Sequence, residues 1–455
     1  MSRTDHVTAE SLLSLCDRAL EAAVRGGAEA AEVAAGFATG SGIDFEKNDL
    51  AIAVSDDETS YGIRVIREGR VGFASSNDPE GLEAAVADAL AVAASAPPDP
   101  HAGLPDPSPV TPVEGLNDPS IESCDVAAVT DAGARLLAAI RERDRRLSID
   151  GGGVSATRAV RAIASTTGVR ASEEYGVVGA HLFGMAVDGE AVGSFVVEGE
   201  ASRRAADLEG ILERTTAEFA EKALGALRPE PGESYRGPVL LSPEAVASLL
   251  ASELVAMISA PTVRKGKSPL AQRLGEEIAH ADFSLLDDPT AAGAIGSSAF
   301  DREGRPRRAT PLVEKGVLRT FLFNDYEARA AGRAEGSTGH AAGGSTSLPG
   351  VGPSRLILAP GSRRREDLER DAGRCVVVTR FSGSTNTVTG EFSGVVKAGF
   401  LSRAGERRPV AETLISGNVL EALKQIAGVS SETRRLYGGG VFPWVLIDGI
   451  SVTAG

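Results

Sequence analysis

Two proline-rich stretches interrupt this chain, and we interpret them as a connector and a boundary between domains. Six of the fourteen residues from Ala96 to Pro109 are proline, and a second break, Pro229-Glu230-Pro231-Gly232, follows later. Because proline fixes one backbone dihedral angle and has no N–H to donate, neither stretch can continue a helix or a central strand. We therefore predict an N-terminal α+β domain (1–96), a proline-rich connector (97–120), a central α+β domain (121–228) and a C-terminal domain (229–455).

The spacing of apolar residues predicts an α+β fold. Apolar positions recur at helical spacing over Thr8–Val24, Val126–Arg143 and Ala206–Leu227. Tyr61–Ile66 and Val71–Ser75 read instead as the arms of a β-hairpin. The pattern favours N-terminal α/β units followed by a large, mostly β C-terminal domain with a few helices. The elements expected in that last domain are the strand Pro238–Leu241, the helix Pro243–Ile258, the hairpin Pro311–Phe323, the strands Cys375–Arg380 and Val395–Leu401, the helix Asn418–Ile426 and the strand Trp444–Val452.

The chain is acidic, with 47 Lys and Arg against 63 Asp and Glu, which gives a formal net charge of −16. Nucleic acid or an anionic membrane surface would be repelled, so we expect neither as a direct partner. The three cysteines are far apart, which predicts no disulfide framework and suits a reducing compartment. The first residues lack a signal-peptide core, and no apolar run is long enough to span a bilayer. We therefore expect a cytoplasmic protein.

Local motifs for metal binding or nucleophilic catalysis are missing from the sequence. No two of the five histidines lie within four residues of each other, so only a site assembled from distant histidines stays open. Serines beside glycine, such as Ser337 and Ser382, lie outside any GxSxG turn, and we interpret them as turn residues.

Carboxylates are densest at Asp287-Asp288 and at Asp301 and Glu303, in apparent loops that continue into Pro289 and Gly304. Side chains of this kind in loops most often accept hydrogen bonds within turns, and that is the interpretation we favour. General acid–base chemistry is the alternative.

The stretch Arg380–Phe400 (RFSGSTNTVTGEFSGVVKAGF) is rich in Gly, Ser and Thr but does not have the composition of a linker. Apolar residues recur through it, among them Val388, Phe392 and Val396, and a flexible linker would lack them. Glycine allows the backbone to turn tightly or to approach another backbone closely. The stretch is therefore a candidate contact surface.

Short motifs along nearly the whole chain resemble those of the TldD/PmbA family. They are Arg70–Pro79 (RVGFASSNDP), Asp287-Asp288-Pro289, Phe300–Gly304 (FDREG), Pro311–Leu318 (PLVEKGVL), Ser337-Thr338-Gly339, Asn386–Ser393 (NTVTGEFS), Ala398-Gly399-Phe400, Ile415–Leu420 (ISGNVL) and Val445–Gly455 (VLIDGISVTAG). Each motif is short, but their number and order make a chance resemblance improbable.

The resemblance implies one half of a two-subunit zinc peptidase. In this family a TldD-like subunit carries a helical HExxxH motif, in which two imidazoles bind metal and a carboxylate activates water, and a further cysteine ligand near its C-terminus. The positions of this chain that match His, Glu and His are Ala251, Ser252 and Ala256. No histidine occurs between His181 and His280, and no cysteine occurs near the C-terminus. An alanine methyl group can neither bind a metal nor transfer a proton. The resemblance therefore implies a TldE/PmbA-type subunit without catalytic residues, metal or other cofactor, and places zinc on the partner.

The implied function is that of a non-catalytic subunit in a TldD/TldE-like heterodimer that degrades or processes unfolded peptides. In this family an extended peptide is expected to pair with sheet edges inside a closed chamber. The residues expected to contact the peptide are Ser382, Gly383, Ser384, Asn386 and Gly390. Two other interpretations stay open: a metal-independent peptide-binding or scaffolding homodimer, and a metal-independent hydrolase in a biosynthetic pathway.

Overall fold

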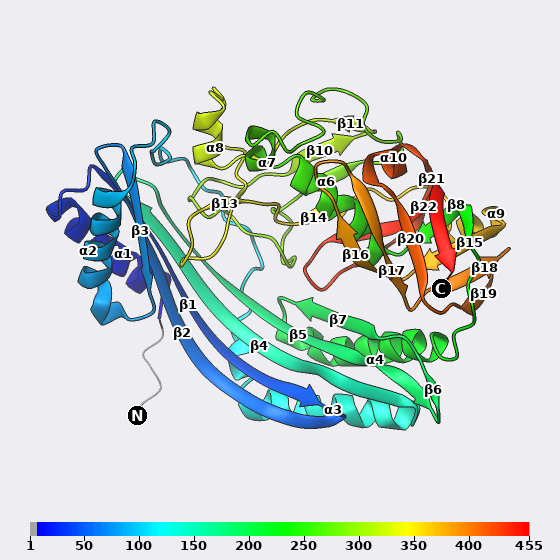
Figure 1. Cartoon of the computed structure of the whole chain (residues 1–455). Coiled ribbons are helices and arrows are strands. Elements are labelled where there is room, and N and C mark those ends of the chain that lie inside the picture. Colours follow the sequence, from blue (N-terminus) through cyan, green and yellow to red (C-terminus); the bar gives the residue numbers. More distant parts are fainter. Residues whose placement is uncertain (1–6, 455) are drawn as a thin grey trace.

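The computed structural model describes residues 7–454, which are arranged around two large sheets (Figure 1). The first sheet has seven strands in the order β3-β2-β1-β4-β5-β6, with β7 paired to β5. Its strands are β1 (Ala30–Glu46), β2 (Asp49–Arg67), β3 (Arg70–Ser76), β4 (Leu147–Ser165), β5 (Arg170–Asp188), β6 (Ala191–Val192) and β7 (Val196–Ser202). The helices of this half are α1 (Ala9–Arg25), α2 (Leu82–Ser95), α3 (Val126–Arg143) and α4 (Leu208–Gly225), with short 3-10 turns η1 (Pro79–Gly81), η2 (Pro119–Ser123) and η3 (Ala205–Asp207).

Four long strands form a curved surface that bends around the C-terminal half (Figure 1). Strands β1, β2, β4 and β5 are 17 to 19 residues long. Side chains alternate between the two faces of a strand. Val33 and Ile43 of β1 therefore point to the same face, where they are buried against the helices. Glu32 and Asp44 point to the opposite, concave face, which the helices leave uncovered.

Strands from both predicted N-terminal units join in this one sheet. Strand β1 lies between β2 and β4, so that Val33 is opposite Ile63 on one side and Ala164 on the other. The proline-rich connector runs back to the C-terminal half, where Arg329 donates hydrogen bonds to the carbonyl groups of His101 and Gly103. The connector therefore contacts the C-terminal half, and the strands before and after it belong to the same sheet.

The C-terminal half contains a branched sheet of 13 strands and a separate two-stranded ribbon. Its strands are β8 (Tyr235–Leu241), β9 (Leu285–Asp287), β10 (Thr310–Glu314), β11 (Val317–Leu318), β14 (Leu356–Leu358), β15 (Arg374–Val378), β16 (Arg380–Thr385), β17 (Glu391–Lys397), β18 (Phe400–Arg403), β19 (Glu406–Pro409), β20 (Thr413–Asn418), β21 (Ile426–Arg435) and β22 (Val441–Ala454). The ribbon is β12 (Ala341–Ala342) with β13 (Gly350–Val351). The helices are α5 (Pro243–Ala245), the π-helical segment η4 (Val246–Ala251), α6 (Ser252–Met257), α7 (Ala260–Arg264), α8 (Asp325–Ala330), α9 (Arg365–Asp371) and α10 (Val419–Lys424). Within residues 7–454, no helix combines the length and apolar character needed to cross a membrane.

The predicted fold class is confirmed, since mixed helix–sheet units precede a large β-rich half. The helix predicted at Val126–Arg143 has the same bounds in the structure. The strand predicted at Val395–Leu401 is wrong, because Ala398 has a positive φ of 51° and the chain turns there. Strand β17 consequently ends at Lys397, and β18 begins at Phe400.

One edge of the first sheet is only partly covered. Strand β3 pairs with Tyr61–Arg67, so within residues 7–454 the stretch Asp49–Ser60 of β2 has β1 on one side and no strand on the other. Most residues of this stretch are exposed, and it includes the acidic run Asp56-Asp57-Glu58.

Helix α2 packs so closely on β3 that Gly72 has no room for a side chain. A Cβ atom there would lie 1.9 Å from the Ala89 carbonyl oxygen and 2.6 Å from the Ala93 nitrogen. We expect Gly72→Ala to lower the free energy of unfolding by about 1–3 kcal/mol, measured by urea denaturation, because the helix must shift outward. Gly438→Ala is the control: its Cβ would meet nothing within 4 Å, and we expect a change below about 0.5 kcal/mol. Equal stability of the two variants would contradict this account.

Candidate functional site

The stretch that the sequence singled out folds into a β-hairpin in the second sheet. Strands β16 and β17 are antiparallel, with Ser382 opposite Val395 and Ser384 opposite Ser393, and β17 continues the sheet to β20. Among the described strands, β16 pairs with β17 alone, so its outer edge is free. A free edge presents unpaired N–H and C=O groups that can pair with another extended chain.

The two faces of β16 have different surroundings. Phe381 points toward the core of the C-terminal half, with its ring edge-on to Phe392 at 5.9 Å between centroids. A Cβ atom on Gly383 would lie 2.6 Å from the Phe381 ring and 2.5 Å from the Gly394 Cα. Gly383 is therefore required for packing within the hairpin. Ser382 and Ser384 lie on the opposite face and are exposed.

Asn386 and Gly390 build the tip of the hairpin. The Asn386 side-chain oxygen accepts hydrogen bonds from the Val388 and Thr389 N–H groups, at 3.0 and 3.3 Å. Gly390 has a positive φ of 80°, which favours glycine, and a side chain there would meet Asn418. Of the five residues expected to contact a peptide, the three on β16 thus lie along the free edge, whereas these two shape the turn.

The helix that matches the HExxxH position packs against β16. It consists of α5, η4 and α6, of which α5 and η4 contact β16 directly. Ala251 is fully buried in the core, Ser252 is exposed, and Ala256 is partly buried. The Ser252 hydroxyl donates a hydrogen bond to the Ala247 carbonyl at 2.8 Å. These side chains offer no ligand set for a catalytic zinc, because two of the three are methyl groups.

Glu253 is the titratable side chain nearest to these positions. Partial burial raises its pKa above the usual range, and a hydrogen bond with Thr385, at the end of β16, partly opposes that rise. A carboxyl group therefore lies on the inner side of the hairpin, close to the free edge. In residues 7–454, no three His, Cys, Asp or Glu side chains are grouped so that they could hold a metal ion.

The four carboxylates singled out by the sequence have structural partners. Asp288 accepts hydrogen bonds from the N–H and hydroxyl groups of Thr290, at 3.0 and 2.6 Å, as expected for a turn residue. Asp301 is completely buried and accepts N–H groups of Glu303, Arg305 and Ala341. Asp288 thus has the local turn contacts predicted for it, and Asp301 is enclosed by backbone donors.

Asp287 and His340 form a buried pair that the sequence did not reveal. The Asp287 Oδ2 atom lies 3.0 Å from the His340 Nε2 atom, and His340 Nδ1 lies 2.9 Å from the Thr338 hydroxyl. Hydrogen bonds from His340 and from the Ser354 and Arg355 N–H groups keep the pKa of Asp287 below its usual range, against the effect of burial. All three side chains of the chain Asp287–His340–Thr338 are at most 4% exposed, so they hold loops together.

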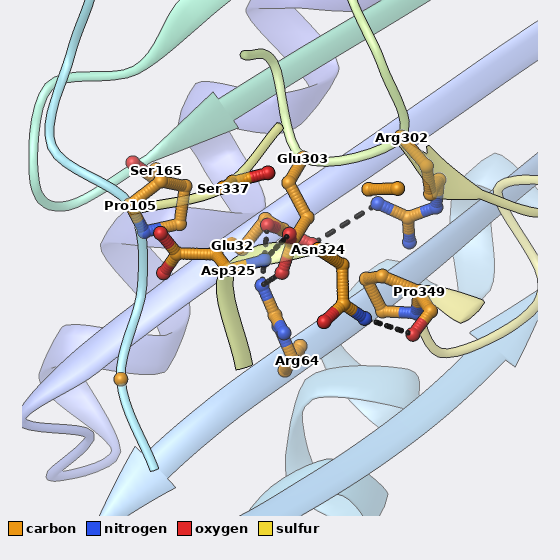
Figure 2. A network of polar contacts seen from close by, with 12 residues as sticks. Glu32, Arg64, Pro105, Ser165, Arg302, Glu303, Asn324, Asp325, Ser337 and Pro349 are labelled. Atoms are coloured by element: carbon orange, nitrogen blue, oxygen red, sulfur yellow. Dashed lines mark hydrogen bonds and ion pairs between the residues drawn. The ribbon is translucent and has the colours of Figure 1, made fainter. Parts of the chain in front are cut away.

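Glu303 belongs to a charged network that joins the two halves of the protein (Figure 2). On the concave face, the Arg64 guanidinium donates to Glu32 at 2.7 Å and to Glu303 at 3.2 Å. Arg302 donates to the other Glu32 oxygen at 3.0 Å. The second Glu303 oxygen accepts the N–H of Asp325 at 2.7 Å. Each oxygen of Glu32 and of Glu303 thus has a partner from β2, from the loop that contains Arg302 or from the start of α8.

Burial raises the pKa of Glu303 from 4.5 to about 7, more than the opposing attraction of Arg64 lowers it. Because its pKa in the folded protein is above that in the unfolded chain, Glu303 favours folding most below pH 4.5. This contribution is lost as the pH rises toward 7.

We expect Glu303→Gln to weaken the pH dependence of stability. Between pH 5 and pH 8 the free energy of unfolding of the variant should fall less than that of the unaltered protein. The two decreases should differ by on the order of 3 kcal/mol. Urea denaturation at both pH values measures this difference. Glu314→Gln, at an exposed position, is the matched control and should leave the pH dependence unchanged. The same slope in both variants would contradict the assignment.

The C-terminal half of the chain matches a known family. Residues 234–454 match the family model described as the PmbA/TldA metallopeptidase C-terminal domain, and residues 31–93 match PmbA/TldA metallopeptidase domain 1. The fold agrees with that of TldE from Thermococcus kodakarensis: the TM-score is 0.83 at 24% sequence identity, over 97% of this chain and 99% of that one.

Two relatives align with this chain over most of their length, and a third aligns over half of its own. The chain is 32% identical over 419 residues to a metalloprotease of Methanothermobacter thermautotrophicus. This alignment covers 89% of each protein. It is 27% identical over 428 residues to metalloprotease PmbA of Escherichia coli O157:H7, which covers 90% of this chain and 88% of the relative. An uncharacterized protein of Methanocaldococcus jannaschii is 31% identical over 218 residues, which is 48% of this chain and 50% of its own length. The matched domains and the long alignments show that this chain belongs to the PmbA/TldD family of metalloproteases.

Proposed function

We propose that this chain is the non-catalytic subunit of a heterodimeric zinc metallopeptidase that processes unfolded peptides in the cytoplasm. The partner is a TldD-like chain that carries the HExxxH motif and the zinc. The observation that carries the proposal is the place of the free β16 edge, which lies beside the helix where Ala251 and Ala256 match the histidines of the motif.

The edge of β16 fits an extended peptide of many sequences. Backbone groups along Arg380–Thr385 can form a strand ladder with a substrate, and such bonds do not depend on side-chain identity. Ser382 and Ser384 add small hydroxyl side chains that leave room for the residues of the peptide. This chain would thus bind and orient the peptide, whereas the zinc of the partner would activate water and polarise the scissile carbonyl group.

The division of labour between subunits can be tested by reconstitution. We expect cleavage of an unstructured peptide by this chain mixed with an HExxxH-bearing homologue, and loss of cleavage on addition of a zinc chelator. The isolated chain should neither cleave the peptide nor contain stoichiometric zinc by elemental analysis. Chelator-resistant cleavage by the isolated chain would favour a metal-independent hydrolase. Tight peptide binding by a homodimer that forms no complex with the homologue would favour a scaffold.

Pairing at a strand edge can be tested with N-methylated peptides. In an added strand, alternate N–H groups point toward β16, so N-methylation of those residues removes hydrogen bonds, whereas N-methylation of the others does not. We expect one of two alternately N-methylated peptides to lose at least about tenfold in affinity, and the other to bind like the parent peptide. Equal affinity of both peptides would contradict edge pairing.

A further inference from the structure

Two cations lie side by side where β16 begins. Arg380 is the first residue of this strand and is directly opposite Lys397, the last residue of β17. Within residues 7–454, neither side chain forms an ion pair with a carboxylate. Alternation places Arg380 on the same face as Ser382 and Ser384, away from the core.

Within the described residues, Arg380 lacks the acidic partner that several other arginines of this sheet have. Arg403 on β18 pairs with Glu233 at 2.7 Å, and Arg407 on β19 pairs with Glu369 at 2.7 Å. By contrast, the Nε atom of Arg380 is buried and has no hydrogen-bond partner. Burial lowers the pKa of Arg380, and no nearby carboxylate opposes this effect. A partly desolvated guanidinium of this kind gains most from an anion that comes from outside the chain.

The backbone on both sides of this cation pair is held in place. The Ser242 hydroxyl donates to the Thr379 carbonyl, next to Arg380, at 2.6 Å. The Ala398 N–H, next to Lys397, donates to the Ser194 hydroxyl of the loop before β7 at 3.0 Å. The two cations therefore sit at the anchored end of the hairpin, and Asn386–Gly390 form its opposite end.

We propose that Arg380 and Lys397 bind the carboxylate at the C-terminal end of a peptide that pairs antiparallel with β16. This inference rests on the function proposed above for the β16 edge. An antiparallel strand ends where β16 begins, which brings its carboxylate to Arg380. A parallel strand would instead place a positively charged amino terminus against two cations.

The chemistry of the two side chains suits a carboxylate. A guanidinium can donate two parallel hydrogen bonds to the two carboxylate oxygens, and an ammonium group adds a compact charge. Since β16 has six residues, the paired part of the peptide would span about 20 Å. The position of a peptide on β16 would then be set by its C-terminal end, whatever its sequence.

The test uses peptides of about eight residues built from Thr, Ala and Gln, with an N-terminal fluorophore. One probe has a free C-terminal carboxylate, a second has a C-terminal amide, and a third has the amide but ends in Glu. Fluorescence anisotropy with the full chain, alone and with its catalytic partner, gives the affinities. We expect the free acid to bind about tenfold more tightly than the amide, as for a hydrogen bond to a charged group. The third probe shows whether a side-chain carboxylate can replace the terminal one.

Variants assign this difference to the two cations. In Arg380→Gln the free acid should bind no better than the amide, whereas the affinity of the amide should stay as in the unaltered chain, which shows that the edge is intact. Lys397→Gln should reduce the acid–amide difference by a smaller factor. Arg308→Gln removes an exposed arginine in the C-terminal half and should change nothing.

The outcomes separate this inference from the function on which it rests. Equal binding of acid and amide by the unaltered chain, or a tenfold difference that survives Arg380→Gln, would overturn the carboxylate site. If the alternately N-methylated peptides still differ in affinity in that case, edge pairing stands and only the carboxylate site falls. If no probe binds, or if both N-methylated peptides bind equally, the function proposed for β16 falls as well.

Discussion

The C-terminal half is joined to the first sheet by a buried ionic cluster, in which Glu32 contacts Arg302 and Arg64 contacts Glu303. Glu32 is 1% exposed, and it projects from the concave face of the first sheet. Removing one member of a buried, hydrogen-bonded ion pair costs about 3–5 kcal/mol, because it leaves a charge without a partner. A second charged contact lies on β7 and α4, where Arg434 of β21 meets Glu198 and Glu218. Two separate ionic contacts thus keep the two halves from sliding past each other.

This arrangement gives the β16 edge a fixed position relative to the first sheet. The hairpin is tied to the central part of the chain through Ala398 and Ser194, and its inner face packs on the helix that contains Ala251. In the proposed heterodimer, the substrate peptide then meets a preformed strand edge. A binding edge that is already ordered does not have to be ordered at the moment of binding, which lowers the cost of association.

Local elements of this fold could be read from the sequence, but their partners could not. The apolar face of α3 and the hairpin at Glu68-Gly69 depend on neighbours within a few residues, and both were predicted. The pairing of β1 with both β2 and β4 depends on residues far apart in the chain, so no local pattern predicts it. The turn at Ala398 was missed because a residue other than glycine adopts the left-handed conformation there.

The sequence predicted where the candidate site lies, but not what each of its residues does. Composition singled out Arg380–Phe400, and the structure places Ser382 and Ser384 on its exposed edge. Gly383 leaves room for the Phe381 ring. This role depends on side-chain packing, which the sequence does not specify. The raised pKa of Glu303 likewise depends on burial between two halves of the chain. The isolation of Arg380 could be seen only once every neighbouring carboxylate had been located.

The outer edges of β2 and β16 differ in charge. In residues 7–454, β16 and residues 49–54 of β2 have a strand on one side only, so an extended peptide has two places on this molecule where it could add a strand. The run Asp56-Asp57-Glu58 makes the β2 edge acidic, whereas Arg380 of β16 and Lys397 of β17 place two cations at the start of β16. Electrostatics would therefore sort an anionic chain end away from one edge and toward the other, and added salt would blur this discrimination before it weakened the backbone pairing itself.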